Sequence, residues 1–343
     1  MFSALIEKLQ RREDLSVDEA SGAMREIMDG TAGPAQIAGF LIALAMKGER
    51  PAEIVGLAQT MRARATRLSN TYAPVFDTCG TGGDRSHTFN VSTVAALVVA
   101  ACGVRVAKHG NRAVSSTCGS ADLFEALGVQ IAAPPPVVER CLGEGGIAFF
   151  LAPTFHPSMR HAGPTRRELG VRTAFNLLGP LTNPAGATRQ LVGVPRPELT
   201  ELVARSLGQL GSERAWVVHG ADGLDEISTT GYTKISECRG TTVNTYYLHP
   251  SDVRLRKASA PELVGGSAAD NARIARDVLA GRAGAPRDIV LLNAGASLFI
   301  AGAAPSVVTG IAMAADAIDT GRAATVLDTL VRLSNLAPEA ATV

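Results

Sequence analysis

Residues 77–84 read DTCGTGGD, and residues 90–93 read NVST at the start of an apolar stretch that continues to Cys102. Three of the four residues from Gly80 to Gly83 are glycine, which reaches positive φ angles and lets other groups approach the backbone closely. Because strand-like residues precede this stretch, it predicts a strand, a glycine loop and a helix whose N-terminus favours anions. The loop is therefore a candidate phosphate site, although a tight strand-to-helix connection would look the same.

Short apolar strands and helical patterns alternate from Ala73 onward, which predicts an α/β domain with a mainly parallel sheet. Ligands of such sheets usually lie at the carboxyl ends of the strands, and the polar motifs of this chain repeatedly follow strands. The expected strands are residues 74–78, 104–108, 148–151, 215–219, 241–248 and 289–292. The expected helices between them are residues 94–102, 121–127, 198–210, 268–280 and 304–319.

The first seventy residues contain helical patterns only, over residues 2–10, 16–28, 35–46 and 51–68. The sequence therefore predicts a small α-helical domain over residues 1–70 and a large α/β domain over residues 71–343. A further helical patch, residues 164–178, interrupts the alternation. We expect it, within about residues 164–184, to pack on the N-terminal helices.

Composition argues against nucleic acid and membranes as partners. Among 343 residues, 33 Lys and Arg balance 32 Asp and Glu, so any attraction for anions must come from local clusters. The longest apolar runs contain roughly ten residues, short of the ~20 that cross a bilayer. The five cysteines form no CxxC pair, which favours a reduced, cytoplasmic protein.

A basic cluster, KHGNR at residues 108–112, follows the strand at 104–108 and precedes SSTCGSAD at residues 115–122. Cationic side chains, hydroxyls and glycine together suit a phosphorylated sugar, because they supply charge-assisted and backbone hydrogen bonds. The alternative is a solvated surface turn. We favour the ligand site because the charges gather at one strand end.

Residues 156–161, HPSMRH, lead into Arg166-Arg167-Glu168 and then into NLLGPLTNP at residues 176–184. Two histidines and three arginines this close together could bind an anionic substrate. They could equally form the polar face of a helix, with Glu168 as their partner.

Asp225 and Glu226 follow the strand at 215–219 in a loop that contains glycine. In a loop both carboxylates can converge on one cation, and Mg²⁺ prefers few carboxylates together with water and phosphate oxygens. The pair therefore suits magnesium and pyrophosphate. A helix N-cap followed by a first-turn glutamate is the alternative.

These motifs, in this order, resemble those of the anthranilate phosphoribosyltransferases, and the similarity covers nearly the whole chain. The resemblance implies a nucleoside phosphorylase-like phosphoribosyltransferase fold and a homodimer formed through the helical domains. It implies transfer of the phosphoribosyl group from 5-phosphoribosyl 1-pyrophosphate to anthranilate, with Mg²⁺, in tryptophan biosynthesis. The matching residues are Gly80–Asp84, Asn90–Thr93, Lys108–Arg112, Gly119–Asp122, Arg166–Glu168, Asn176–Pro184 and Asp225-Glu226.

The resemblance also implies the site residues. Two magnesium ions, expected with bound substrate, would be held by Ser92, Asp225 and Glu226. Anthranilate would contact Gly80, Asn111, His156 and Arg166, with Arg166 meeting its carboxylate. The residues expected to bind phosphoribosyl pyrophosphate are Gly80, Thr81, Gly82, Gly83, Asp84, Asn90, Val91, Ser92, Thr93, Lys108, His109, Gly110, Asn111, Ser116, Gly119 and Ser120.

Two segments depart from the family pattern. Arg85-Ser86-His87 replaces the small residues that are common there, so Arg85→Gly is expected to raise the KM for phosphoribosyl pyrophosphate. Thr117-Cys118 stands where Lys-Ser is common, which leaves backbone contacts with phosphate at that turn.

Three other classes of protein fit less well. A pyrimidine nucleoside phosphorylase would share the fold, but residues 166–184 and the acidic pair Asp225-Glu226 argue against it. A non-enzymatic nucleic-acid-binding relative would have a basic surface and would lack the acidic pair. A type I phosphoribosyltransferase would have a strand that ends in two acidic residues before a Thr-rich loop, which this chain does not show.

Overall fold

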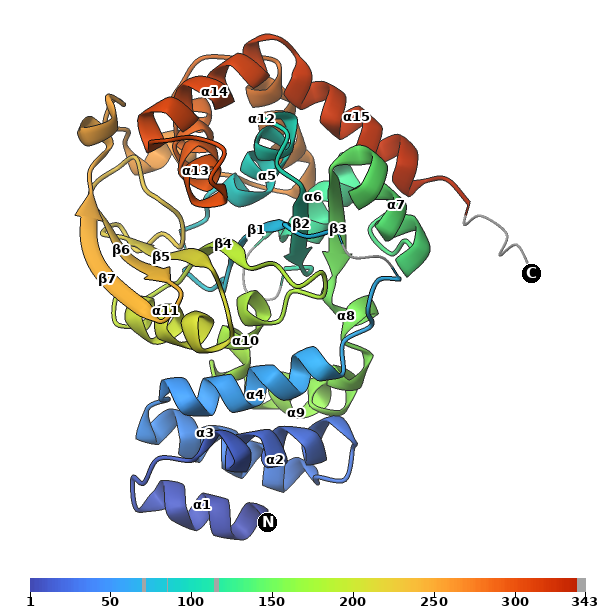
Figure 1. Ribbon diagram of the computed structural model, residues 1–343, viewed down its shortest axis with the longest axis vertical. Helices are drawn as coiled ribbons and strands as arrows, with labels where there is room; N and C mark the ends of the chain where they lie inside the picture. The colour runs from blue at the N-terminus through green and yellow to red at the C-terminus, as the bar shows by residue number, and fades with distance from the viewer. Residues whose placement is uncertain (70–71, 85, 114–116, 338–343) are drawn as a thin grey trace.

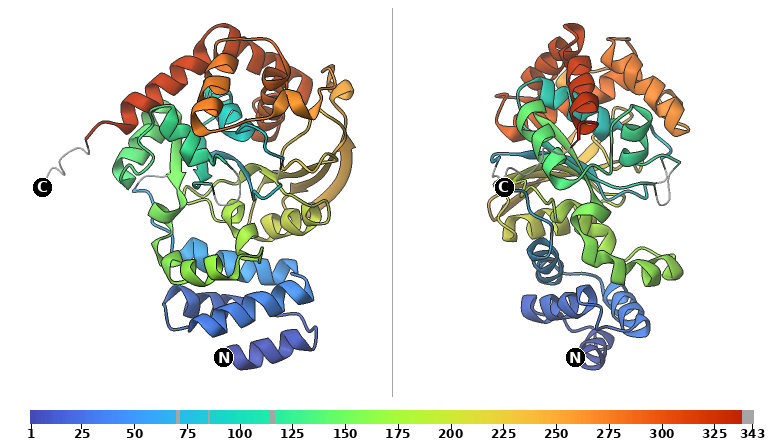
Figure 2. Two further views of the ribbon diagram at one scale, coloured as in Figure 1. Left: turned by 180° about the vertical axis from the view of Figure 1, so that it is seen from behind. Right: turned by 90° about the vertical axis from the view of Figure 1, so that its right-hand side faces the viewer.

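A computed structural model describes residues 1–69, 72–84, 86–113 and 117–337. At the N-terminus, helices α1 (Phe2–Gln10), α2 (Val17–Met28), α3 (Pro34–Lys47) and α4 (Pro51–Ala63) stack on one another. Figures 1 and 2 show that they form a separate layered lobe beneath a larger lobe built around a sheet. Among the described residues, no helix has the length and apolar character needed to span a bilayer.

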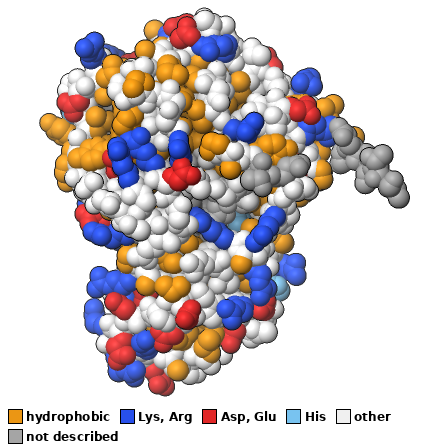
Figure 3. Space-filling model, in the orientation of Figure 1, with side chains coloured by type: hydrophobic (Ala, Val, Ile, Leu, Met, Phe, Trp, Pro, Cys, Tyr) orange, Lys and Arg blue, Asp and Glu red, His pale blue; other side chains and the backbone are white. Residues whose placement is uncertain are grey.

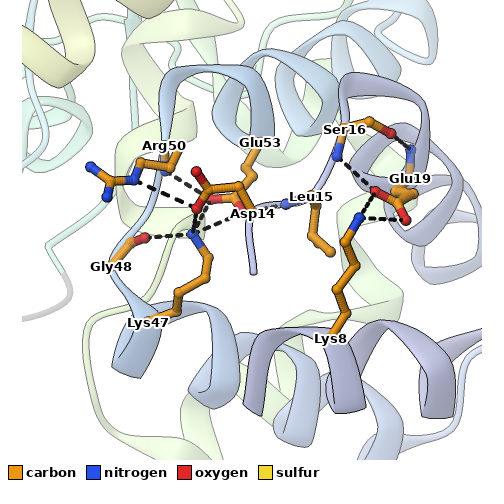
Figure 4. A network of polar contacts seen from close by, with 9 residues as sticks. All are labelled: Lys8, Asp14, Leu15, Ser16, Glu19, Lys47, Gly48, Arg50 and Glu53. Atoms are coloured by element: carbon orange, nitrogen blue, oxygen red, sulfur yellow. Dashed lines mark hydrogen bonds and ion pairs between the residues drawn. The ribbon is translucent and has the colours of Figure 1, made fainter. Parts of the chain in front are cut away.

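A buried acidic side chain fixes the connections between these helices. The Glu53 carboxylate on α4 accepts hydrogen bonds from the backbone N–H groups of Leu15, at 2.9 Å, and Arg50, at 2.7 Å. Lys47 lies 3.0 Å from the same carboxylate (Figure 4). Nearby, Ser16 and Glu19 form a capping box at the start of α2. Both connections to α2 and α4 therefore have their backbone donors satisfied.

The large lobe contains a seven-stranded sheet in the order β3-β2-β1-β4-β5-β6-β7. Strands β1 to β5 are parallel to one another, whereas β6 pairs antiparallel with both β5 and β7. The prediction of a mainly parallel sheet is confirmed. The strands are β1 (Phe76–Gly80), β2 (Val106–Gly110), β3 (Ile147–Leu151), β4 (Arg189–Gly193), β5 (Arg214–Gly220), β6 (Thr233–Arg239) and β7 (Thr242–Leu248).

Alternate residues of the central strands enter two different cores. On β5, Trp216 and Val218 pack into the core shared with α5 (Val91–Ala101) and α13 (Ala285–Ala301). Ala215 and Val217 point the other way and join the core of the N-terminal helices, α10 (Phe175–Leu181) and α11 (Leu199–Gln209). Because successive side chains of a strand point to opposite faces, one face of the sheet packs on the helical lobe and the other packs on α5 and α13.

Helices cover the remaining surface of the sheet and its loops (Figures 1 and 2). They are α6 (Ser120–Ala126), α7 (Pro135–Gly145), α8 (Ala152–Phe155), η1 (Pro157–His161), α9 (Gly163–Leu169), η2 (Pro250–Val253), η3 (Ala260–Leu263), α12 (Ala268–Leu279), α14 (Val307–Asp319) and α15 (Arg322–Ser334).

The structure corrects three secondary-structure predictions. Residues 289–292 are not a strand, because they lie inside helix α13. The helix expected over residues 51–68 ends at Ala63, and the patch at 164–178 is two helices separated at Gly170, whose φ is +61°. Strands β4 and β6 had not been predicted.

Candidate active site

The predicted motifs meet at the carboxyl ends of the parallel strands. The glycine loop follows β1, the basic cluster begins on β2, and the acidic loop follows β5. Figure 3 shows Lys and Arg side chains on both sides of the waist, the narrowing between the helical lobe and the sheet lobe. An anion in this region would therefore lie among positive charges.

Glycines let the acidic loop lie directly against two strands. A Cβ atom on Gly80 would lie 2.3 Å from Asp225 Oδ2, and one on Gly193 would lie 1.5 Å from the Asp225 carbonyl oxygen. Gly80 and Gly193 are paired neighbours on β1 and β4. A side chain at either position would therefore displace Asp225.

The acidic pair binds two of the backbone donors that were expected to bind pyrophosphate. The Gly82 N–H donates to Asp225 Oδ2 at 3.0 Å, and the Ser92 N–H, at the start of α5, donates to Glu226 Oε1 at 3.0 Å. The alternative for this pair, a helix N-cap at Asp225, is not found, since both acids lie in a loop. Both donors therefore already bind a carboxyl oxygen.

Burial and mutual repulsion disturb the protonation of these acids. Burial, followed by the nearby charges of Asp84 and Glu226, raises the pKa of Asp225 well above its usual range. Burial also raises the pKa of Glu226, against the opposing charge of Lys108. Converging carboxylates that repel one another are the arrangement that a divalent cation relieves.

Lys108 is buried beneath the glycine loop and donates through Nζ to the Thr78 carbonyl oxygen. Asp77, beside it, accepts from the His109 N–H at 3.2 Å and from Asn183 Nδ2 at 2.8 Å. Burial raises the pKa of Asp77, and the charge of Lys108 opposes that shift. Asp77 thus holds β2 and the Asn183 turn beside β1.

Two histidines pack against each other with their ring centroids 5.2 Å apart. His109 Nδ1 lies 3.0 Å from the Gly179 carbonyl oxygen, and His156 Nε2 lies 3.0 Å from that of Thr182. A carbonyl accepts only, so each of these nitrogens carries the proton. The other ring nitrogens, His109 Nε2 and His156 Nδ1, are buried acceptors without a hydrogen-bond partner.

Burial keeps both imidazoles neutral. Burial, together with the neighbouring His156, lowers the pKa of His109 to about 3. Burial lowers the pKa of His156 to about 4. At neutral pH the pair therefore offers two uncharged acceptors for an N–H group.

Arg166 on α9 lies over the Phe175 ring, with Cζ 5.0 Å from the ring centroid. Burial lowers the pKa of its guanidinium. In the described part of the chain, the partner expected from the helix-face alternative, Glu168, forms no ion pair with it. Arg166 is therefore available to a carboxylate ligand.

The turn after β2 is held by its own contacts. Arg112 forms ion pairs with Asp122, at 2.9 Å, and Glu125, at 2.8 Å, and Asn111 Oδ1 accepts from the Arg112 N–H. The Gly119 N–H donates to Asp122 Oδ2 at 2.9 Å. The charge of Arg112 is thus already paired.

The other expected site residues divide into four groups. Asn90 donates to the Cys118 carbonyl oxygen and accepts from Asn271 Nδ2, both at 3.0 Å, so its amide holds α5 against neighbouring segments. Thr93 has a buried hydroxyl without a partner. Ser116 and Arg85 lie outside the described residues. Val91 begins α5, Gly110 ends β2 and Ser120 begins α6, whereas Thr81 and Gly83 belong to the glycine loop. Within the described part of the chain, none of these five residues forms a hydrogen bond with the side chain of Asp225 or Glu226.

Sequence reasoning missed several residues that hold the site together. The amide of Asn293 on α13 binds both the N–H and the carbonyl of Ile227, at 3.0 and 2.9 Å, and so fixes the acidic loop. An Asn within the apolar middle of α13, residues 289–296, was the signal. Asp77 and Arg172 were also missed, because their partners are backbone groups distant in sequence.

The candidate metal ligands suit magnesium better than a metal whose ligands must all come from the protein. Asp225 and Glu226 offer carboxylates, and the Ser92 side chain lies within hydrogen-bond reach of Glu226. Among the described residues, no group of three or more His, Cys, Asp or Glu side chains is arranged to hold a metal. Mg²⁺ completes its shell with water and phosphate oxygens, so a small carboxylate set suffices.

Comparison with known proteins defines the class first. Residues 3–65 match the helical bundle domain of the glycosyl transferase family, and residues 72–324 match its a/b domain. The chain is therefore a two-domain glycosyl transferase.

Individual relatives narrow this class. The anthranilate phosphoribosyltransferase of Moorella thermoacetica is 55% identical over 96% of this chain and 98% of its own length. The crystal structure of the Thermus thermophilus enzyme superposes with a TM-score of 0.91 at 45% identity, over 97% of this chain and 99% of that one. The Saccharomyces cerevisiae enzyme in complex with PRPP and Mg superposes with a TM-score of 0.88 at 27% identity, over 97% of both chains. This chain belongs to the anthranilate phosphoribosyltransferase family.

Proposed function

We propose that this chain transfers the 5-phosphoribosyl group from 5-phosphoribosyl 1-pyrophosphate to anthranilate, with release of pyrophosphate, as a step of tryptophan biosynthesis. The observation that carries the proposal is the pair of backbone donors, Gly82 N–H and Ser92 N–H, bound by the two buried acids. Backbone donors beside carboxylates and a buried lysine supply what a magnesium-bound pyrophosphate needs.

The glycine loop, the start of α5 and Lys108 would bind the phosphoribosyl pyrophosphate. Breaking the bond from C1 to pyrophosphate leaves an oxocarbenium-like sugar and a strongly anionic leaving group. Lys108 is buried and close to Glu226 and Asp77, so its charge acts in surroundings of low dielectric. Its role is to stabilise the negative charge of the departing pyrophosphate.

Ser92, Asp225 and Glu226 would hold magnesium, and two ions are proposed when substrate is bound. Bound Mg²⁺ would neutralise charge on the pyrophosphate. Asp225 and Glu226 would then change partners, from the backbone N–H groups of Gly82 and Ser92 to the cation. The two N–H groups would become free for phosphate oxygens.

Anthranilate would lie beside Gly80, Asn111, His156 and Arg166. Arg166 has a guanidinium that stacks on Phe175 and can bind the carboxylate. The unpartnered nitrogens of His109 and His156 can accept from the amine. Because that amine is already neutral at pH 7, we expect these residues to orient it rather than deprotonate it.

The direct test is the loss of anthranilate fluorescence in the presence of purified protein, phosphoribosyl pyrophosphate and Mg²⁺. We expect decay only when all three are present. A protein that instead releases the base from thymidine or uridine with phosphate, and leaves anthranilate unchanged, would be a nucleoside phosphorylase.

We also propose a homodimer formed through the helical lobe. Helices α1 and α3 border a groove of about 550 Å³. Its lining is mostly apolar and includes Ile6, Leu9, Ile42 and Met46, and Met46 is 76% exposed. A second copy would cover this apolar surface, as expected of exposed patches of this kind.

Two further assignments complete the proposal. The helical domain would comprise residues 1–70 together with about residues 164–184, and the α/β domain the rest. The side chains of Phe175 and Leu178 support this division, because they pack into the core of the N-terminal helices. A cytoplasmic location is consistent with the five cysteines, which form no disulfide with one another.

A further inference from the structure

Arg172 reaches the glycine loop from the segment between α9 and α10. Its Nη1 donates to the Gly82 carbonyl oxygen at 2.6 Å, and its Nη2 lies 3.4 Å from the Thr81 carbonyl oxygen. A planar guanidinium that binds two successive carbonyls fixes two peptide planes at once. Arg172 therefore determines how this part of the loop is turned.

The orientation of these carbonyl groups determines the direction in which the backbone N–H groups of the loop point. In a trans peptide the C=O and the N–H point in opposite directions. Because the Thr81 carbonyl faces Arg172, the Gly82 N–H faces the other way, where it meets Asp225 at 3.0 Å. The Gly82 carbonyl also faces Arg172, so the Gly83 N–H is turned away from the guanidinium. Within the described residues, no acceptor is recorded for the Gly83 N–H.

Gly83 provides the space that this contact needs. Its φ is +78°, and a Cβ atom there would lie 1.8 Å from Arg172 Nη1. Gly82 has a similar φ of +66°, but a Cβ atom there would meet nothing within 4 Å. The two glycines thus share the same backbone requirement, and only Gly83 is also limited by Arg172.

We propose that Arg172 is a positioning residue for pyrophosphate binding, which holds the glycine loop by its carbonyls so that its N–H groups face the substrate. This inference rests on the proposed function. It assigns to Arg172 a role through the loop backbone, distinct from direct contact with the phosphates. Burial lowers the pKa of the Arg172 guanidinium, and the nearby charges of Asp225 and Asp84 oppose that shift.

The test compares Arg172→Ala, Arg172→Gln and Arg172→Lys with Arg205→Ala, which removes an exposed arginine of α11. Calorimetry measures binding of phosphoribosyl pyrophosphate with Mg²⁺, and kinetics give both KM values. For Arg172→Ala we expect about tenfold weaker binding, as for the loss of a charge-assisted hydrogen bond. The KM for anthranilate and the Tm should stay near wild type. Arg172→Gln, a neutral donor, should recover part of the affinity.

Two results would overturn the proposal. One is unchanged affinity in Arg172→Ala. The other is wild-type affinity in Arg172→Lys with Arg172→Gln as weak as Arg172→Ala, because charge alone would then matter and Arg172 would be a direct phosphate ligand. Wild-type protein that neither binds phosphoribosyl pyrophosphate nor consumes anthranilate would contradict the proposed function itself.

A double-mutant cycle provides a second readout that does not depend on charge. Gly83→Ala should weaken binding more than Gly82→Ala in the wild-type background, because only the former collides with Arg172. In the Arg172→Ala background that excess should disappear. An equal excess in both backgrounds would show that Arg172 does not act through Gly83.

Discussion

At the scale of single residues, burial sets the charge of the groups that surround the candidate site. It raises the pKa of Asp225 and Glu226 and lowers that of His109 and His156. All four shifts favour the neutral form, and the same region contains the buried Lys108 and the half-buried Arg166. The substrate and its metal would restore the charge of the acids.

The two histidines give a prediction about pH. With pKa values of about 3 and 4, His109 and His156 should stay neutral at pH 5.5, where an ordinary histidine is mostly charged. NMR of protein labelled at histidine should show no titration of the His109 and His156 imidazoles between pH 5 and 8. His109→Gln and His156→Gln each identify one of them. Titration of either signal near pH 6.5 would contradict the burial described here.

From the sequence, the residues proposed to bind ligands could be predicted better than the residues that hold the backbone of the site in place. The glycine loop, Lys108 and the acidic pair could be recognised because their residue types follow predicted strands. Asp77 and Asn293 could not, since what matters is which backbone groups the fold brings to them. The role of each expected site residue stays a prediction.

At the scale of elements, two of the errors in the predicted secondary structure arose because residue composition alone does not show how a segment is packed. Residues 289–292 form an apolar run of four, which does not distinguish a strand from a buried helix. They belong to α13, which is buried nearly all round and so has no polar face to reveal its period. Strand β4 was missed because it begins with the polar residues Arg189 and Gln190. Gln190 is nevertheless buried, and its Nε2 donates to the Pro180 carbonyl oxygen at 2.7 Å.

The substitution Glu53→Gln tests whether this buried carboxylate stabilises the connections between the N-terminal helices. Glu53→Gln removes the charge that binds Lys47 and two backbone N–H groups in a buried place. We expect a loss of about 3 kcal/mol in the free energy of unfolding, because one member of a buried pair is removed. Chemical denaturation measures it. Glu13→Gln, at the exposed pair with Arg11, is the matched control and should leave the Tm unchanged. Equal effects of the two substitutions would contradict this role.

At the scale of the whole molecule, the candidate site lies between two lobes that share a core. Arg62 on α4 donates to the carbonyl oxygens of Leu181, at 2.6 Å, and Leu210, at 3.0 Å. Leu181 is the last residue of α10, and Leu210 is the C-cap of α11. Arg172 then joins the segment after α9 to the glycine loop. These contacts connect the helical lobe to the sheet lobe and to the glycine loop of the candidate site.

The groove on α1 and α3 predicts the oligomeric state. Light scattering should give the mass of two 35.5 kDa chains for wild type. Met46→Glu places a charge in the apolar groove and should give a monomer. Val308→Glu, on α14 away from the groove, should remain dimeric. A monomeric wild type, or a dimer that Met46→Glu leaves intact, would show that this groove is not the interface.

The acidic pair gives the most direct test of the central claim, that Asp225 and Glu226 serve a magnesium-bound pyrophosphate in transfer to anthranilate. The measurement is the rate of anthranilate fluorescence loss with phosphoribosyl pyrophosphate and varied Mg²⁺, for wild type and for Asp225→Asn combined with Glu226→Gln. We expect wild-type decay that requires Mg²⁺, and a rate reduced by about a hundredfold or more in the variant, whose Tm should not fall because its buried acids repel one another. A folded variant that consumes anthranilate at the wild-type rate would contradict the account.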